Sequence, residues 1–499
     1  MPGLVETKSP RGRFRFNVNI GSVLFLLGRL LLTLALALLI PALVGQYLNE
    51  DARWSFYVAA GIAGALGLFL ERYFHESDEF DFGRREAFVL VSSAWLVGTI
   101  VGALPYVLEN GIAFAVNALF ESASGFTTTG ASIFTDVESL PGAVLLWRAL
   151  TQWIGGMGII VLGIAILPKL AVGGMELLGA EAPGPMQEKL TPRIAQTAKA
   201  LWGIYVILTV AEIGILLALG LDPLDAVAHA LASMATGGFS TKNASISAFA
   251  SPAVEWTITL FMILAGASFA VHYQWLRGKF GVLKSNPELR LYLGILMMGT
   301  AVVFLDLMHA RTTSSPFEAL SLSAFQVVSV VTTTGFATAN YDEWPQLSRV
   351  LLFLLMFTGG CAGSTGGSVK IVRLYIVFKK IAVDLKRMLQ PRAVLPVRLG
   401  GRGIPDDVVS SVTTFFVLFM MLFVLGGVAL TIFGVDPLTA FTASAACLGN
   451  IGPGFGGVGP TMTYAGLPAA AKVVLAVLMI VGRLELYTVM VIFFFRRLA

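Results

Sequence analysis

The chain has 499 residues, of which 56% are hydrophobic and only 13% are charged. Soluble domains carry about 25% charged residues, so the composition excludes an ordinary soluble protein and indicates a polytopic membrane protein. The formal net charge of +4 is modest, and no basic run is interleaved with aromatic residues, which argues against a nucleic-acid-binding surface.

The first long apolar run extends over about 20–44. It is longer than the core of a signal peptide, and no small-residue cleavage site follows it. We therefore expect this run to be retained as a membrane span.

Ten apolar runs are long enough to cross a bilayer, which takes about 20 residues. They lie near 22–46, 54–72, 86–108, 143–168, 199–219, 254–276, 289–308, 348–382, 407–433 and 469–495. Shorter apolar stretches of re-entrant length separate spans three and four, five and six, seven and eight, and nine and ten. The sequence therefore predicts the order helix, short helix, loop, helix four times, after two additional N-terminal helices.

Three of the short stretches begin with a capping residue followed by proline, which suits the first turn of a helix. These starts are Asp222-Pro223, Ser315-Pro316 and Asp436-Pro437, and Glu318 gives the second of them capping-box spacing. The first short stretch, 113–124, has no such start. If each short helix begins at the outer side of the membrane and points toward the membrane centre, its negative dipole end favours a cation there.

Each short stretch leads into a Thr/Gly segment, at 127–130, 235–238, 332–335 and 449–452, which we call segments one to four. One copy is typical of a glycine turn that caps a helix, but fourfold recurrence favours four strips of backbone carbonyls around one axis. Glycine permits the positive φ that turns successive carbonyls to one side, and Thr129 and Thr334 add hydroxyl oxygens. No segment contains the Asp or Glu that would hold a divalent cation, so we expect a filter for a monovalent one. The candidate filter residues are Thr128, Thr129, Gly130, Thr236, Gly237, Gly238, Thr333, Thr334, Gly335, Asn450, Ile451 and Gly452.

Lys and Arg gather in alternate connections, which sets the orientation by the positive-inside rule. The basic residues lie before span one, between spans two and three, between six and seven, after span eight and at the C-terminus: Lys8, Arg11, Arg13, Arg15, Arg72, Arg84, Arg85, Lys279, Lys284, Arg290, Lys379, Lys380, Lys386, Arg387, Arg392, Arg496 and Arg497. Both termini are therefore expected in the cytoplasm, with all four segments at the outer side around a pseudo-fourfold pore.

This parallel arrangement predicts an all-α fold in five units. They are an N-terminal helix pair at 1–80 and pore repeats at 81–175, 176–284, 285–400 and 401–499.

A glycine-rich loop interrupts span eight. It consists of Gly359, Gly360, Cys361, Ala362, Gly363, Ser364, Thr365, Gly366 and Gly367. Its five glycines, at about 1 kcal/mol each, should unwind the helix, and unwound backbone at membrane depth needs protein or a water-filled cavity around it. We expect this glycine loop to lie under the filter as a gate; a flexible helix hinge is the alternative.

Arg483 falls near the middle of span ten, where an unpaired charge costs at least about 2.5 kcal/mol. Its expected partners are either the carbonyls of the glycine loop, which would make it a latch of the gate, or Glu485 and Glu121, which would make it a structural ion pair. Lys370, just after the loop, is expected to reach the cytoplasmic interface or the same cavity.

An enzyme is the alternative from another functional class. Ser364 or Cys361 would be its nucleophile, with Lys370 as the only nearby base in the sequence. A lone hydroxyl without an oriented base is rarely catalytic.

Several motifs along nearly the whole chain resemble the Trk/Ktr/HKT superfamily of potassium transporters, and its bacterial TrkH branch in particular. They lie at 125–131, 147–158, 272–273, 359–367, 450–454 and 482–485, and they include Gln152-Trp153-Ile154-Gly155-Gly156-Met157-Gly158 and Gly482-Arg483-Leu484-Glu485. The two additional N-terminal spans also resemble this branch.

The resemblance implies K⁺ uptake across a bacterial inner membrane, a homodimer, a gating loop in the third repeat, and control by a cytosolic nucleotide-binding ring protein of the TrkA type. It also implies that glycine at Gly130 suits K⁺, whereas serine there accompanies Na⁺ preference in some plant relatives. Coupling to H⁺ or Na⁺ in a symporter on the same scaffold stays open. K⁺ is expected as the transported ion and no covalent cofactor is implied; the expected partners are membrane lipid, a second copy of the chain and the ring protein, with no nucleic acid.

Overall fold

The computed structural model describes residues 19–74, 84–279, 281, 285–313, 315–393 and 395–484, except 166–189. Lys8, Arg11, Arg13, Arg15, Lys284, Arg496 and Arg497, on which part of the expected orientation depends, lie outside these residues.

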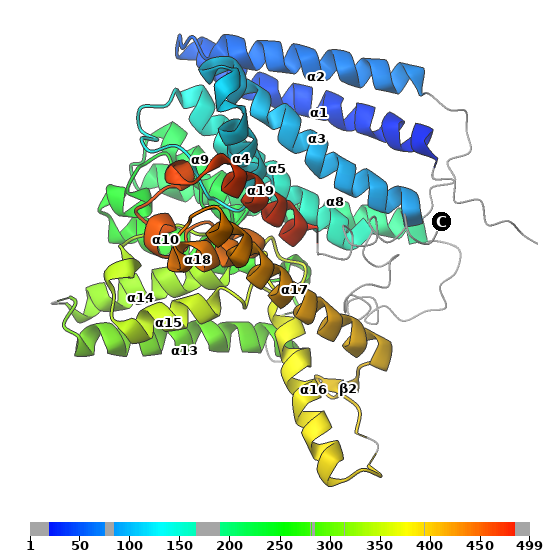
Figure 1. Ribbon diagram of the computed structural model, residues 1–499, viewed down its shortest axis with the longest axis vertical. Coiled ribbons are helices and arrows are strands. Elements are labelled where there is room, and N and C mark those ends of the chain that lie inside the picture. Colours follow the sequence, from blue (N-terminus) through cyan, green and yellow to red (C-terminus); the bar gives the residue numbers. More distant parts are fainter. Residues whose placement is uncertain are drawn as a thin grey trace, which may run out of the picture.

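The N-terminal helices α1 (Ile20–Tyr47) and α2 (Arg53–Tyr73) form an antiparallel pair along one edge of the bundle, with α3 (Arg84–Asn110) beside α1 (Figure 1). The pair is tight where two glycines meet, because a Cβ on Gly28 would lie 2.9 Å from the carbonyl oxygen of Gly67, and the reverse distance is also 2.9 Å. Small residues at such crossings let helix backbones approach closely in a membrane.

Each of the four repeats contains a short helix between two longer segments. The first has α3, α4 (Ala115–Phe126) and α5 (Gly142–Ala165); the second has α8 (Leu190–Ala218), α9 (Pro223–Met234), α10 (Pro252–Gly266) and α11 (Phe269–Leu276); the third has α13 (Pro287–His309), α14 (Pro316–Val331), α15 (Gln346–Leu355) and α16 (Ile371–Leu389); the fourth has α17 (Asp406–Ile432), α18 (Pro437–Leu448) and α19 (Ala469–Arg483). The predicted order of helix, short helix, loop and helix is present in all four.

Short 3-10 turns and one hairpin complete the described secondary structure. The turns are η1 (Ile112–Phe114), η2 (Ser245–Phe249), η3 (Tyr341–Glu343), η4 (Gly456–Val458) and η5 (Tyr464–Gly466). Strands β1 (Arg398–Leu399) and β2 (Arg402–Gly403) pair antiparallel, with Arg398 opposite Gly403. Together with α16, this hairpin projects from one end of the bundle (Figure 1).

Six described helices are long and apolar enough to cross a membrane, and a seventh span is formed by the bent pair α10 and α11. The continuous span expected at 254–276 is wrong, because these two helices meet at 98°. The span expected at 348–382 is broken between α15 and α16, where the glycine loop lies. The expected spans 143–168 and 469–495 are only partly within the described residues.

The capping predictions have different outcomes. Asp222 accepts a hydrogen bond from Leu224 N, and Asp436 accepts one from Thr439 N. Ser315 stands at the N-cap of α14, but its side chain makes no cap hydrogen bond, so the predicted capping box is wrong. As expected, α4 begins without a side-chain cap.

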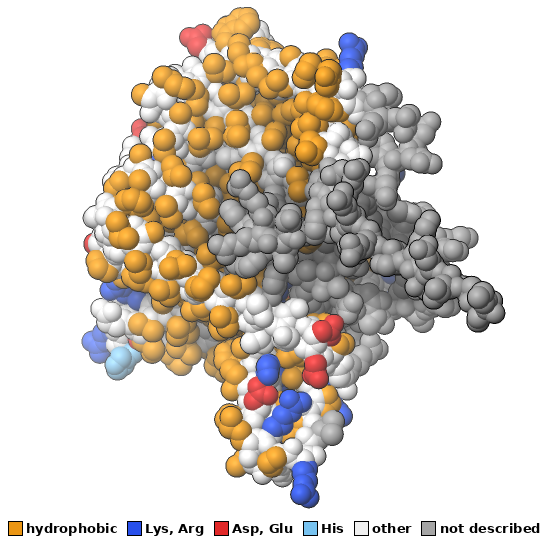
Figure 2. Space-filling view, turned by 45° about the vertical axis from the view of Figure 1, so that its right-hand side comes forward, with side chains coloured by type: hydrophobic (Ala, Val, Ile, Leu, Met, Phe, Trp, Pro, Cys, Tyr) orange, Lys and Arg blue, Asp and Glu red, His pale blue; other side chains and the backbone are white. Residues whose placement is uncertain are grey.

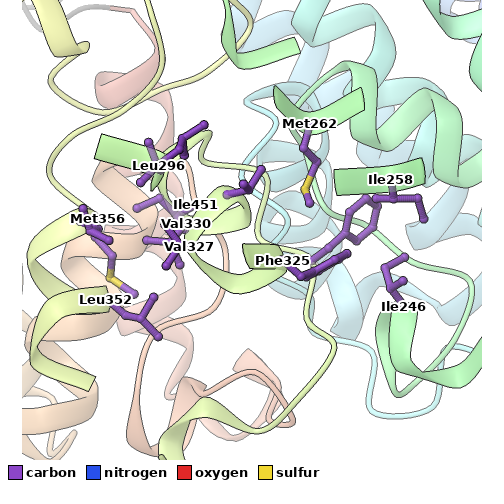
Figure 3. Close-up of a cluster of buried hydrophobic side chains, with 14 of the residues drawn as sticks. Ile246, Ile258, Met262, Leu296, Phe325, Val327, Val330, Leu352, Met356 and Ile451 are labelled. Carbon is purple, nitrogen blue, oxygen red and sulfur yellow. The ribbon is translucent and has the colours of Figure 1, made fainter. Parts of the chain in front are cut away.

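The short helix α14 is embedded in the largest apolar cluster, which spans the second to fourth repeats (Figure 3). Its members come from α10, α13, α14, α15, η2 and segment four: Ile246, Ile258, Met262, Leu296, Phe325, Val327, Val330, Leu352, Met356 and Ile451. Because all are at least nine-tenths buried, the cluster fixes the end of α14 relative to segment four.

The surface agrees with a bilayer environment. Figure 2 shows hydrophobic side chains spread over the face of the bundle, whereas Lys, Arg, Asp and Glu gather at the projecting end near α16. Exposed apolar side chains on this scale are typical of a protein surrounded by lipid.

Candidate functional site

All four Thr/Gly segments continue their short helices with the same hydrogen bonds. In segment one, Thr128 N donates to Gly125 O at 2.9 Å, and Thr129 N donates to Ser124 O at 2.8 Å. The equivalent donors in the other segments are Thr236 and Gly237, Thr333 and Thr334, and Asn450 and Ile451. This pattern is the Schellman motif of a helix C-terminus.

The residue that turns the chain in each motif has a left-handed backbone. The φ angles are +54° at Thr128, +52° at Thr236, +61° at Thr333 and +54° at Asn450. Glycine usually takes this place, and a threonine there is a conformational outlier that costs about 1–3 kcal/mol. Three such threonines at equivalent positions indicate a site whose backbone is held by its surroundings.

The glycines of the four segments meet in a closed ring. A Cβ on Gly130 would lie 2.2 Å from Gly237 O, one on Gly238 would lie 2.0 Å from Thr334 O, one on Gly335 would lie 2.0 Å from Ile451 O, and one on Gly452 would lie 2.6 Å from Thr129 O. Each glycine therefore faces a carbonyl of the next segment, in the order one, two, three, four and back to one. The φ values of these glycines are +83°, +77°, +85° and +99°, so both conformation and space require glycine.

One cavity of about 170 Å³ is lined by all four of these glycines. Segments that are distant in the sequence, and the residues that follow them, thus border a single cavity.

The threonine hydroxyls are engaged within the protein. Thr129 Oγ1 lies 2.7 Å from Thr127 Oγ1 and accepts a hydrogen bond from Asn450 Nδ2 at 3.0 Å, and Thr334 Oγ1 lies 2.8 Å from Thr332 Oγ1. These contacts brace the segments and engage the hydroxyl oxygens within the protein.

A buried ion pair supports segments one and two. Arg148 Nε lies 2.8 Å from Glu121 Oε1, and both side chains are at most 3% exposed. Glu121 Oε2 accepts from Ile133 N at 2.9 Å, and Arg148 Nη1 donates to Ser240 O at 3.0 Å. The pair thereby links the stretches of chain that follow both segments. The sequence offered a signal for it, namely opposite charges in two apolar helices.

Two further side chains, for which no role was predicted from the sequence, donate hydrogen bonds to segment carbonyls. Gln152 Nε2 donates to Gly237 O at 2.6 Å, and the Tyr464 hydroxyl donates to Gly452 O at 2.7 Å. Gln152 stands out in the sequence as an amide within an apolar helix.

The glycine loop lies at the C-terminal ends of three short helices. Gly367 N donates to Thr333 Oγ1 at 2.7 Å, and Thr365 Oγ1 donates to Met234 O at 3.2 Å. A Cβ on Gly367 would lie 2.5 Å from Gly449 O. The loop therefore contacts the ends of α9, α14 and α18, directly beside segments two, three and four.

Two buried cations bind this loop. Arg483 Nη1 donates to Thr365 O at 2.8 Å, and Lys370 Nζ donates to Gly366 O at 2.7 Å. Their residues are 2% and 7% exposed. Among the described residues, Arg483 contacts the loop carbonyl, one of the partners expected for it; Glu121 pairs with Arg148 instead, and Glu485 lies outside the described residues. Lys370 faces the loop and not the cytoplasmic interface.

The contacts of the glycine loop give no arrangement for nucleophilic catalysis. Ser364 Oγ donates to Cys361 O at 2.6 Å, and Lys370 Nζ approaches the main-chain oxygen of Ser364, not its hydroxyl. Within the described part of the chain, no group of three or more His, Cys, Asp or Glu residues could hold a metal ion.

Comparison with known proteins agrees with this architecture. The family model "TrkH: Cation transport protein" matches residues 56–496. The Trk system potassium uptake protein TrkH of Escherichia coli (strain K12) is 39% identical over 94% of this chain and 97% of its own length, and that of Halomonas elongata is 38% identical over 95% and 98%.

The crystal structure of the potassium transporter TrkH from Vibrio parahaemolyticus matches with a TM-score of 0.87 and 35% identity, covering 95% of this chain and 98% of the other. These likenesses confirm the family resemblance and the all-α membrane fold. The chain belongs to the TrkH family of cation transport proteins.

Proposed function

We propose that this protein takes up K⁺ across the bacterial inner membrane through a gated pore whose selectivity filter is the ring of four Thr/Gly segments. The observation that carries this proposal is the closed cycle of glycine-to-carbonyl contacts between successive segments. Relatives that are named potassium uptake proteins support K⁺ as the transported ion.

The chemistry of the ring suits a monovalent cation. Backbone carbonyls can replace the hydration shell of an alkali ion, whereas Ca²⁺ and Mg²⁺ prefer carboxylate ligands. The segments contain no acidic residue. The short helices also direct their C-terminal, negative dipole ends toward the loop below the ring, which favours a cation there.

The glycine loop is proposed as the gate of this pore. It contacts the ends of three short helices, and Arg483 and Lys370 both donate to its carbonyls. Two positive charges at this depth oppose the passage of a cation by Coulomb repulsion. Displacement of the loop together with Arg483 would open the path.

Coupled symport with H⁺ or Na⁺ is the second candidate, and one buried carboxyl favours it. Glu212 of α8 is fully buried and accepts a hydrogen bond from Ser233 of α9, two residues before segment two. An ionisable residue at this depth is a candidate for a proton relay.

The enzyme alternative is set aside, because the family consists of transport proteins and the loop hydroxyl has no base in contact among the described residues.

The arrangement in the membrane follows from the same proposal. Both termini are cytoplasmic, residues 1–80 form the additional helix pair, and residues 81–175, 176–284, 285–400 and 401–499 form the pore repeats. A TrkA-type ring protein would dock on the cytoplasmic side.

We propose a homodimer in which α16 contributes to the interface. This helix projects from the bundle (Figure 1) and exposes Phe378, Ile381 and Leu385 by 67%, 51% and 57%. These residues recur at helical spacing on one face. Cysteines placed at Leu385 should crosslink two chains in membranes, whereas cysteines at the lipid-exposed Leu66 of α2 should not; equal crosslinking at both would refute this interface.

Uptake of Rb⁺ into liposomes that contain the purified protein tests the function. We expect uptake that is driven by membrane potential, competed strongly by K⁺ and weakly by Na⁺. Equal competition by both ions would refute a K⁺-selective filter. Uptake that strictly requires a proton gradient, and that Glu212→Gln abolishes, would establish the symporter instead.

A further inference from the structure

One side-chain amide forms hydrogen bonds with segment two from outside the ring. Gln152 of α5 is fully buried. Its Nε2 donates to Gly237 O at 2.6 Å, and its Oε1 accepts a hydrogen bond from Phe239 N at 3.1 Å. The two bonds bracket Gly238, so one side chain fixes the backbone on both sides of a filter glycine.

The carbonyl that Gln152 holds is a member of the ring. Gly237 O faces Gly130, and the corresponding carbonyls of the other contacts are those of Thr334, Ile451 and Thr129. Within the described ranges, Gly237 O alone among these four carbonyls accepts a hydrogen bond from a side chain. The ring is therefore chemically asymmetric at this point.

The asymmetry comes from the residue type and not from the fold. Gly155 and Gly482 occupy matching positions, because a Cβ on each would lie 1.8 Å and 2.0 Å from the last carbonyls of α4 and α18. Three residues before each glycine stand Gln152 and Met479. The first repeat thus carries an amide where the fourth carries a thioether.

The hydrogen bond changes what Gly237 O offers to an ion. A carbonyl that accepts an N–H bond has one lone pair occupied and its direction fixed, whereas a carbonyl without such a donor can turn toward a small ion. K⁺ over Na⁺ preference depends on the size of the cage and on the field strength of its carbonyls. Holding one carbonyl in place should oppose the contraction of the carbonyl cage that Na⁺ binding requires.

We propose that Gln152 is a positioning residue of the filter, and that its hydrogen bonds to Gly237 and Phe239 strengthen the preference for K⁺ over Na⁺. This inference rests on the proposed filter function of the ring.

The test replaces the amide and measures ion competition in proteoliposomes. Gln152→Met removes both hydrogen bonds and introduces the side chain found at 479, and Gln152→Glu keeps the acceptor but removes the donor. The ratio of Na⁺ to K⁺ concentrations that halve Rb⁺ uptake should fall about three- to tenfold in both variants, because both lose the hydrogen bond to Gly237 O, and a fall of this size is expected for the loss of that one bond. The control is Trp153→Phe, which removes the neighbouring hydrogen bond to Thr209 and should leave the ratio unchanged.

The Na⁺/K⁺ competition ratios of these variants decide whether Gln152 contributes to ion preference. A wild-type ratio in both variants, with Rb⁺ uptake retained, would overturn the inference. If either variant fails to fold, Gln152→Asn provides the measurement, because it keeps the amide but is one methylene too short to reach both partners. Gly130→Ser tests the filter itself. A changed ratio in Gly130→Ser with unchanged ratios in the Gln152 variants refutes only the role of Gln152. An unchanged ratio in Gly130→Ser refutes the filter.

Discussion

Replacing Gly130 by alanine should separate backbone strain from damage to the ring. At φ +83° an alanine costs about 1–2 kcal/mol relative to glycine. Its Cβ would lie 2.2 Å from Gly237 O, whereas ordinary contacts begin at 3.4 Å. The carbonyl would therefore have to move by about 1.2 Å, the difference between these two distances, against the hydrogen bond from Gln152. We expect Gly130→Ala to lose about tenfold in K⁺ over Na⁺ preference, or about 1.4 kcal/mol.

Gly111 provides a matched control for this substitution. It has the same φ of +83°, and nothing lies within 4 Å of the position its Cβ would occupy. Gly111→Ala should therefore lower the free energy of unfolding by about 1–2 kcal/mol and leave ion preference unchanged.

Two measurements on both variants complete this test. Thermal unfolding in detergent reports the shared backbone cost, and Rb⁺ uptake with Na⁺ competition reports the ring. Our reasoning is refuted if Gly130→Ala retains the wild-type ion preference, or if Gly111→Ala alters it to the same extent.

Three other predictions concern individual side-chain contacts. Arg483→Ala removes the donor to Thr365 O and should raise basal Rb⁺ flux, whereas Arg483→Lys, which keeps the charge, should not; equal flux in wild type and Arg483→Ala would leave the glycine loop a passive hinge. Glu121→Gln leaves a buried guanidinium uncompensated and should cost about 3–5 kcal/mol in unfolding free energy; a thermal midpoint equal to wild type would contradict this. Asp436→Ala should lower stability by about 1 kcal/mol, but Ser315→Ala should not, since Ser315 makes no cap bond; equal losses in thermal unfolding would count against the capping assignment.

The sequence predicted those features that depend on local chemistry. The four short helices, the caps at Asp222 and Asp436, and the break at the glycine loop follow from proline, capping side chains and clustered glycines, and the structure contains all of them. Ser315 shows the limit of such reasoning, because a capping motif in sequence does not guarantee the side-chain orientation that makes the bond.

Features that depend on contacts between repeats were decided by the tertiary structure. Local pattern did not predict the 98° bend between α10 and α11, where Cys361 N of the glycine loop binds Gly266 O. Glu121 was one of the two carboxylates expected to pair with Arg483, yet it pairs with Arg148, at 2.8 Å.

The sequence by itself determined the membrane class, the family and the four Thr/Gly segments, because hydropathy, glycine and helix caps act over a few neighbouring residues. Only the tertiary structure decided how these segments meet: each glycine against the carbonyl of the next segment, with Gln152 on Gly237 and Arg483 on Thr365. Most of these contacts join residues about a hundred positions apart in the chain, and the one between Gly452 and Thr129 joins the last segment to the first. Packing of the whole bundle is what brings these residues together.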